Sequence, residues 1–199
     1  MRDWEVRVKA VFDRVSEIPV EEWDHARRFL IPRSFKKSEH LLEAGVVAEH
    51  SFLLLSGIAR NYYITEDGKE FISGFILENQ FCGSVNSIIA GRPSRFFIQA
   101  LEDCETVLLP RKNILQLYDR HRCWERFGRV IAEGVMMFNE VREGELLDSL
   151  EERYLRLLRD HPALHDRVPQ YHIASYLGIT NVALSRLRGR LRDKGDLPG

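Results

Sequence analysis

The chain has 199 residues, 44% of them hydrophobic, so it can bury the core of one large domain or two small ones. Its 29 basic and 30 acidic side chains give a formal net charge of -1, which argues against binding polyanions through overall charge and leaves a local basic patch open. No apolar run approaches the roughly 18 residues of a membrane span, and the N-terminus lacks the apolar segment of a signal peptide. We expect a soluble, cytoplasmic protein with no membrane partner.

The cysteines and histidines give no sign of a metal centre. Cys82, Cys104 and Cys123 are odd in number and lack Cys-x-x-Cys spacing, which fits neither a disulfide framework nor an iron-sulfur cluster. His161 and His165 have helical spacing, but Pro162 lies between them and predicts a turn. The sequence also lacks a nucleophile elbow, a phosphate-binding glycine loop and a His-Glu-x-x-His motif, so we expect neither an enzyme nor a metal site.

The N-terminal half begins with helical patterns and continues with β-type patterns. Apolar residues recur at i, i+3, i+4 and i+7 and predict a helix over the first fifteen residues, and a second helix is predicted over residues 20–30. Short apolar runs at roughly ten-residue spacing between residues 35 and 109 predict an all-β sandwich or barrel. Within it, Asp67-Gly68 predicts a two-residue hairpin turn, because glycine adopts positive φ without steric cost.

A helical pattern runs from about Lys112 to His161, with no proline before Pro162. Its middle carries a seam of apolar and small residues spaced 4, 3, 4 and 3 apart, namely Phe127, Ile131, Gly134, Phe138 and Val141. Such a heptad-like seam is narrower than the apolar stripe of a helix lying flat on a core. Two interpretations are open: the helix packs on its own chain, or it shares the seam with a second copy.

The segment from Gln170 to Gly189 has the pattern of a helix-turn-helix. Its residues are apolar where two crossed helices bury side chains against each other, and Ala174 is small where the helices touch. Gly178 stands at the turn, and Thr180 can cap the second helix. We predict helices over residues 170–177 and 181–191. The apolar positions are Ile173, Leu177, Ile179, Leu184 and Leu187.

The second helix of this pair is basic. Residues 168–199 carry five basic and two acidic side chains, an excess of +3 in a chain that is otherwise slightly acidic. Together with the helix-turn-helix spacing, this charge favours DNA over a merely solvated face. We expect Arg186 to contact a guanine, and Arg190 and Arg192 to contact phosphates. The residues expected at the DNA are Thr180, Asn181, Val182, Ser185, Arg186, Arg188, Arg190 and Arg192.

A β-roll, a long helix and a helix-turn-helix in this order resemble the cyclic-AMP receptor protein (Crp-Fnr) family of bacterial transcription regulators over nearly the whole chain. The segments 41–45, 52–57 and 66–70 resemble the strand-and-turn marks of its sensor domain. The resemblance implies an α+β fold: a cyclic-nucleotide-binding-like jelly roll with flanking helices over 1–111, a long dimerisation helix over 112–147 and a helix-turn-helix domain over 148–199. It further implies a homodimer that binds double-stranded DNA, with RNA polymerase as a further candidate partner, and it favours the shared-seam interpretation.

The sequence departs from the nucleotide-binding members at the effector pocket. Those members pair a glycine with a glutamate and, further along, an arginine with a small hydroxyl residue. Here Gly83 is in place, Ser84 stands for the glutamate, and Ser94 stands for the arginine, with Arg95 one residue later. Adjacent strand residues point to opposite faces, so we expect Arg95 to point out of the pocket. Asn139 occupies the position at which the cyclic-AMP-binding members have a threonine that contacts adenine. From these departures we expect a small-molecule effector other than cyclic AMP.

The DNA-binding segment departs as well. Asn181-Val182 replaces the Arg-Glu pair of well-known members, and only Arg186 matches. A valine can pack on a thymine methyl group but cannot accept a hydrogen bond from cytosine, so the operator should differ from the family consensus. The sequence ends at Gly199, where many members continue into a β-hairpin wing, and we expect weaker anchoring to phosphates. A second hypothesis is therefore a ligand-sensing interaction module with a degenerate helix-turn-helix that does not bind DNA specifically.

Overall fold

The computed structural model describes residues 2–195, except for the side chain of residue 146. The expectation of a missing wing falls on residues 196–199 and lies outside the described part. The chain divides into two compact units, Met1–Tyr62 with Phe75–Phe138, and Tyr63–Gly74 with Asn139–Gly199. Over residues 2–195, no helix is long and apolar enough to cross a membrane.

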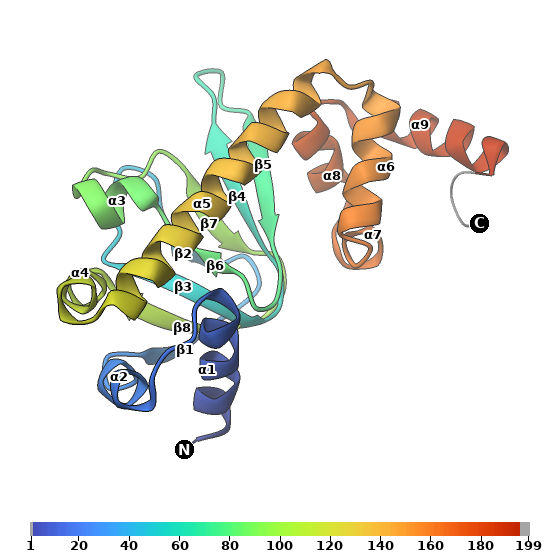
Figure 1. Ribbon diagram of the computed structural model, residues 1–199. Coiled ribbons are helices and arrows are strands. Elements are labelled where there is room, and N and C mark those ends of the chain that lie inside the picture. Colours follow the sequence, from blue (N-terminus) through green and yellow to red (C-terminus); the bar gives the residue numbers. More distant parts are fainter. Residues whose placement is uncertain (1, 196–199) are drawn as a thin grey trace. The chain divides into compact units, whose positions relative to one another are not determined.

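Two four-stranded sheets form the β-roll that the sequence predicts (Figure 1). The first has the order β1 (Ile31–Phe35), β8 (Cys104–Pro110), β3 (His50–Ser56) and β6 (Phe81–Cys82). The second has the order β2 (His40–Leu42), β7 (Phe97–Ala100), β4 (Ala59–Ile64) and β5 (Glu70–Ile76). A short helix, α3 (Val85–Ala90), connects β6 to β7. With the helices below, this confirms the α+β class.

Strand β3 is buried on both faces, and this explains how the first sheet carries helices on its outer side. Phe52 and Leu54 belong to the core between the two sheets, whereas Leu53 and Leu55 belong to a separate core beneath the helices. Successive side chains of a strand point to opposite faces, so a continuous apolar run supplies both cores.

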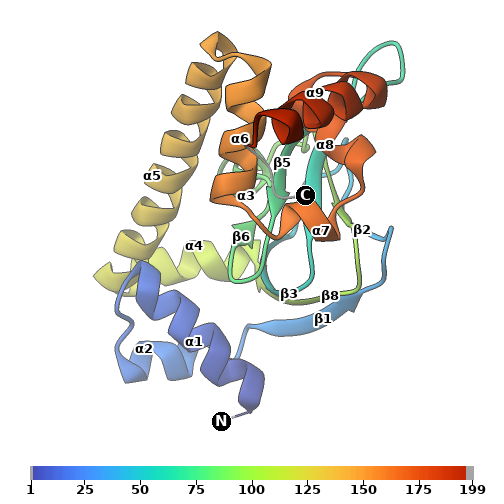
Figure 2. The ribbon, with the colours of Figure 1, turned by 90° about the vertical axis from the view of Figure 1, so that its right-hand side faces the viewer.

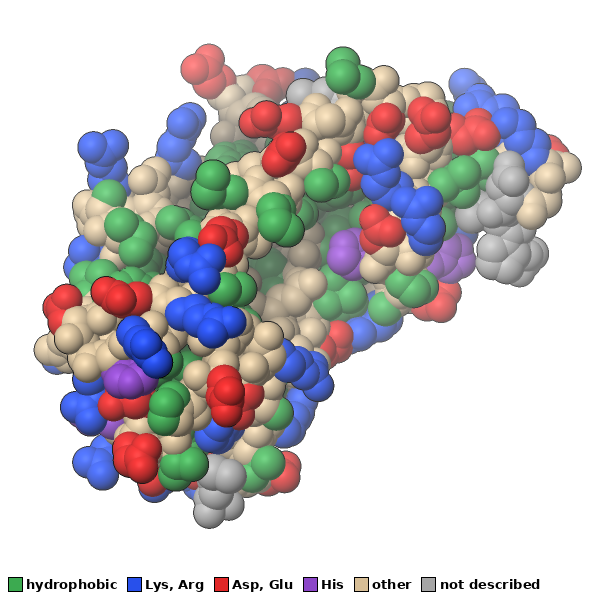
Figure 3. Space-filling view, viewed as in Figure 1, with side chains coloured by type: hydrophobic (Ala, Val, Ile, Leu, Met, Phe, Trp, Pro, Cys, Tyr) green, Lys and Arg blue, Asp and Glu red, His purple; other side chains and the backbone are tan. Residues whose placement is uncertain are grey.

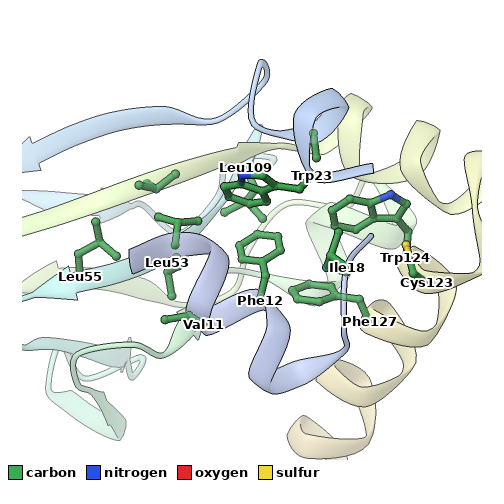
Figure 4. Packing of buried hydrophobic residues seen from close by; sticks show 13 residues of the cluster. Val11, Phe12, Ile18, Trp23, Leu53, Leu55, Leu109, Cys123, Trp124 and Phe127 are labelled. Carbon is green, nitrogen blue, oxygen red and sulfur yellow. The ribbon is translucent and has the colours of Figure 1, made fainter. Parts of the chain in front are cut away.

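Four helices form the second core with the outer face of that sheet: α1 (Asp3–Val15), α2 (Val20–Ala26), α4 (Arg111–Arg120) and the start of α5 (Arg122–Gly144). Figures 1 and 2 show α1 and α2 beside each other at the N-terminal end, and Figure 4 shows the aromatic residues that fill the core. The predicted first helix is confirmed. The second ends at Ala26 rather than Leu30, because Phe29 and Leu30 make i to i-3 turn hydrogen bonds.

The helical pattern that starts at Lys112 is interrupted at His121, where the sequence predicts no break. His121 has extended backbone angles, φ -154° and ψ 140°, so α4 ends before it and α5 begins after it. The Nδ1 atom of His121 accepts a hydrogen bond from the backbone N–H of Cys123 at 3.2 Å. This side chain therefore caps α5 at a position that contains neither glycine nor proline.

The hairpin between β4 and β5 has a loop of residues 66–68 rather than the predicted two-residue turn. The N–H of Thr65 donates to the carbonyl of Lys69, and the N–H of Gly68 donates to the carbonyl of Thr65, both at 2.9 Å. Gly68 has φ +78°, so the predicted need for glycine is confirmed, but in a longer loop.

The second unit contains this hairpin tip, the end of α5 and five further elements: η1 (Glu145–Leu147), α6 (Leu150–Asp160), α7 (Leu164–Arg167), α8 (Gln170–Leu177) and α9 (Asn181–Lys194). The Oγ of Ser175 in α8 donates to the carbonyl of Glu70 at 2.9 Å and accepts from the N–H of Ile72 at 3.3 Å. One serine thus satisfies two backbone groups of β5.

Candidate functional site

Helices α8 and α9 form the helix-turn-helix that the sequence predicts. Gly178 ends α8 with φ +73°, and no atom lies within 4 Å of a Cβ built there, so the backbone conformation and not the space favours glycine. The Oγ1 of Thr180 accepts a hydrogen bond from the N–H of Ala183 at 3.2 Å and caps α9. The first predicted helix matches α8, and the second begins as predicted but extends to Lys194.

An apolar stripe fixes the two helices against each other. The stripe is almost inaccessible to solvent and consists of Ile173, Ala174, Leu177, Leu184, Leu187 and Leu191. Ile179, which the sequence predicts to be buried between the two helices, is only partly buried. Because the stripe covers one face of α9, the opposite face stays exposed to solvent.

The exposed face of α9 carries most of the residues that the sequence predicts at DNA. Asn181, Val182, Ser185 and Arg186 are exposed at its start, and Val182 has an exposed fraction of 61%. In the part of the chain that the structure describes, Arg186 makes no ion pair and no side-chain hydrogen bond. Because its donors are uncommitted there, the planar guanidinium is available to a base or a phosphate.

The other four predicted positions differ in orientation. Arg190 and Arg192 are exposed, whereas Arg188 is partly buried and its Nη2 lies 3.1 Å from Nε2 of His165 in α7. Thr180 is exposed, but its hydroxyl is the helix cap. Sequence analysis did not identify His165 as a partner of this helix.

The candidate effector segment runs from β6 through α3 to Arg95. Gly83 has φ +151°, and a Cβ there would lie 3.1 Å from the Oγ of Ser51. Ser84 is buried, and its Oγ accepts from the N–H of Ser87 at 3.3 Å, so it caps α3. Arg111, which sequence analysis did not select, donates from Nε to the carbonyls of Ser87 and Ile88 at 3.0 and 2.9 Å. These contacts hold α3 in place.

The end of this segment offers no buried positive charge. Ser94 is buried, and its Oγ donates to the carbonyl of Phe96 at 2.8 Å and accepts from the same residue's N–H at 3.3 Å. Arg92 and Arg95 are both exposed and make no ion pair among residues 2–195. The side chains of this segment therefore do not fit the phosphate of a cyclic nucleotide, which needs a charge-assisted hydrogen bond. Asn139 is exposed on α5 within the second unit.

The apolar seam of α5 has two different environments. Phe127 is 8% exposed and its ring stacks on Phe12 with 4.8 Å between centroids, and Ile131 packs against the same core. Phe138 and Val141 are 50% and 54% exposed, and Gly134 has no atom within 4 Å of a built Cβ. Figure 3 shows hydrophobic side chains exposed along α5.

Two surface hollows of the first unit lie away from the effector segment. One, of about 220 Å³, is lined by residues between His40 and Phe52. The other, of about 820 Å³, lies between residues 16–19 and the start of α5 and is lined by three arginines and two glutamates among others. Neither hollow is lined by Gly83, Ser84, Ser94 or Arg95.

Comparison with known proteins agrees with this architecture. Residues 32–121 match the cyclic nucleotide-binding domain family. The β-roll part of the chain is thus similar to that family. The fold of the chain is similar to that of FixK2 from Bradyrhizobium japonicum, which aligns with a TM-score of 0.76 and 20% identity, covering 85% of this chain and 88% of that chain.

Two further relatives support the same fold. The c-di-GMP-responsive global regulator CLP from Xanthomonas campestris has a TM-score of 0.70 and 16% identity, covering 91% of this chain and 95% of that chain. Electron transport regulator A from Shewanella oneidensis is 24% identical over 175 residues, 82% of this chain and 69% of the relative. These matches support the fold, and within the matched β-roll the hydroxyls of Ser84 and Ser94 form hydrogen bonds inside their own segment.

Proposed function

We propose that this chain is an effector-responsive, DNA-binding transcription regulator of the Crp-Fnr type. The observation that carries the proposal is Arg186, which is exposed on the outer face of a capped recognition helix and makes no ion pair with any other residue of the described range 2–195. Val182 and Ser185 lie on the same exposed face, where an apolar group can meet a thymine methyl and a hydroxyl can meet a base edge. The relatives named as regulators support the same class of function.

The proposed active form is a homodimer joined through the second half of α5. Phe138 and Val141 are exposed apolar side chains on the 4-3 seam, and Gly134 leaves room for a second helix to approach. A two-fold dimer would present two copies of α9 to a two-fold symmetric operator.

The proposed effector is not cyclic AMP. A cyclic phosphate bound without a buried arginine lacks a charge-assisted hydrogen bond of about 1.5–3 kcal/mol, which corresponds to a roughly ten- to hundredfold weaker affinity. We expect calorimetric titration of the purified chain with cyclic AMP to give no binding in the submicromolar range. Submicromolar binding would show that Arg92 or Arg95 reaches the phosphate and would contradict this assignment.

Selection from random duplex DNA tests the DNA-binding proposal. We expect enrichment of a two-fold symmetric site, and Arg186→Ala should weaken binding to it by about 1–3 kcal/mol per half-site and relax preference at one base pair. Arg190→Ala is the matched control: it should weaken binding to all sequences alike and lower the salt slope by about one unit. Equal losses on selected and scrambled DNA for Arg186→Ala would contradict its role as the base reader.

The second candidate function is an interaction module that senses a ligand and does not read DNA. Val182 favours it, because an apolar side chain that is 61% exposed at the start of α9 could equally contact a protein. The same selection decides between the two: no enrichment at low salt would support the interaction module and reject the regulator.

A further inference from the structure

Arg188 differs from the other arginines of α9 in the direction it faces. It lies four residues after Leu184 and three before Leu191, both of which are buried, so it borders the inner stripe of the helix. Its side chain is partly buried, and its Nε is fully enclosed without a hydrogen-bond partner among the described residues. An arginine that reaches outward to a phosphate would keep its guanidinium in solvent.

The contact between Arg188 and His165 determines which nitrogen of the imidazole carries the proton. A guanidinium has five N–H donors and no acceptor, so Nη2 of Arg188 must donate to Nε2 of His165 across the 3.1 Å separation. The neutral imidazole then carries its hydrogen on Nδ1, which lies 2.8 Å from Oδ1 of Asp166. Asp166, His165 and Arg188 thus form one chain of hydrogen bonds from α7 to α9.

The surroundings of Arg188 place it on the inner side of the domain. Tyr154 in α6 is fully buried, and burial raises the pKa of its hydroxyl, while the positive charges of Arg188 and Arg192 act in the opposite direction. Arg192 has the same effect although it is exposed, so the inward direction of Arg188 rests on its enclosed Nε and its contact with His165. The side chains expected to read DNA, Val182 and Arg186, are exposed.

We propose that His165 is a positioning residue for the recognition helix, which it holds through Arg188, and that Arg188 makes no contact with DNA. A helix that packs through three leucines can still rotate slightly about its axis, and a directional hydrogen bond from its edge to α7 opposes that rotation. The position of Arg186 relative to the major groove then depends on His165. This inference rests on the proposed function, because it assumes that α9 reads DNA.

The first test needs no DNA. At pH 8, where an ordinary imidazole is neutral, nitrogen NMR of the full chain should show His165 protonated on Nδ1 and unprotonated on Nε2. Arg188→Gln replaces a charged donor by a neutral one and should shift the Nε2 resonance of His165, whereas Arg190→Gln should leave it unchanged. A proton on Nε2 in the wild type would overturn the proposal whether or not the chain binds DNA.

The second test uses the duplex enriched by selection, in a series of salt concentrations. Arg188→Gln should weaken binding by about fivefold or more without changing the salt slope, whereas Arg190→Gln should lower the slope by about one unit. His165→Ala should weaken binding by a similar factor, the double variant should be no worse than either single one, and His165→Gln, which keeps an acceptor, should restore most of the affinity.

A salt slope lowered by Arg188→Gln, or additive losses in the double variant, would overturn the proposal by making Arg188 a phosphate contact. Amide spectra of each variant show whether the domain stays folded. If no duplex is enriched, the proposed function fails, and the NMR result still decides whether His165 holds Arg188.

Discussion

The two halves of α5 share one apolar periodicity and have opposite surroundings. In the first half, Cys123, Trp124 and Phe127 are buried in the core formed with α1, α2 and the outer face of the first sheet. In the second half, Phe138 and Val141 are half exposed to solvent. The difference teaches that a heptad-like spacing identifies the apolar face of a helix but not the partner that covers it.

Each interpretation left open by the sequence therefore applies to a different part of the seam. Packing on the same chain accounts for Phe127 and Ile131, and the shared seam is the proposal for Gly134, Phe138 and Val141. Substitutions at matched positions in the two halves separate the roles.

Phenylalanine to alanine substitutions should show the largest difference. Phe127→Ala removes a ring that contacts Phe12, Phe81 and Trp124, and should lower the free energy of unfolding by about 3–5 kcal/mol. Phe138→Ala should change the unfolding of the monomer by less than about 0.5 kcal/mol, as an exposed position does. Urea denaturation at several protein concentrations measures both effects; similar losses at high dilution would mean that the two halves are equally buried.

A pair of glycines gives the next largest effect. A Cβ at Gly128 would lie 2.5 Å from the Oη of Tyr118 in α4, so Gly128→Ala forces the tyrosine ring to move and should destabilise the first unit by about 1–3 kcal/mol. A Cβ at Gly134 meets nothing within 4 Å, and Gly134→Ala should stabilise the helix of the monomer by up to about 1 kcal/mol. Thermal denaturation of the two variants tests this, and a stabilising Gly128→Ala would contradict the packing of α4 on α5.

Glu22 gives a smaller, pH-dependent effect that belongs to the first half of α5 alone. Burial raises the pKa of Glu22. Hydrogen bonds from Trp124 and Arg120, together with the charge of Arg120, lower the pKa by more than burial raises it, so it lies below the ordinary value of 4.5. The stabilisation is thus present above pH 4.5 and is lost as the pH falls through the lower pKa of the folded state.

Glu22→Gln should reduce stability at neutral pH and flatten this acid dependence. Unfolding free energies of wild type and variant, measured from pH 7 downward, should converge in acid. A difference that stays constant with pH would show that the ionised carboxylate contributes nothing at this site.

Local backbone requirements could be predicted well from the sequence. Gly178 and Thr180 stand where φ must be positive and where an oxygen must cap a helix, and both needs arise from neighbouring residues alone. The break at His121 could not be predicted, because its cap comes from a histidine that lacks the usual breaker signature.

Side-chain direction was only partly predictable. The arginines at 186, 188, 190 and 192 form one basic series in the sequence, yet Arg188 turns toward His165. Its spacing from Leu184 and Leu191 was the available signal, and the partner from α7 could be found only in three dimensions. The departures at Ser84 and Ser94 stay a prediction, and their use in capping α3 and in a turn with Phe96 depends on contacts that spacing does not reveal.

Sedimentation velocity of the wild type and of Phe138→Asp tests the central claim most directly, since it asks whether the exposed half of α5 joins two chains. The account predicts a dimer for the wild type at micromolar concentration and a folded monomer for the variant. A charge buried in the seam costs on the order of several kcal/mol, because the apolar contact is lost and the carboxylate is desolvated. A wild type that is monomeric at this concentration, or a variant that associates as tightly as the wild type, would contradict it.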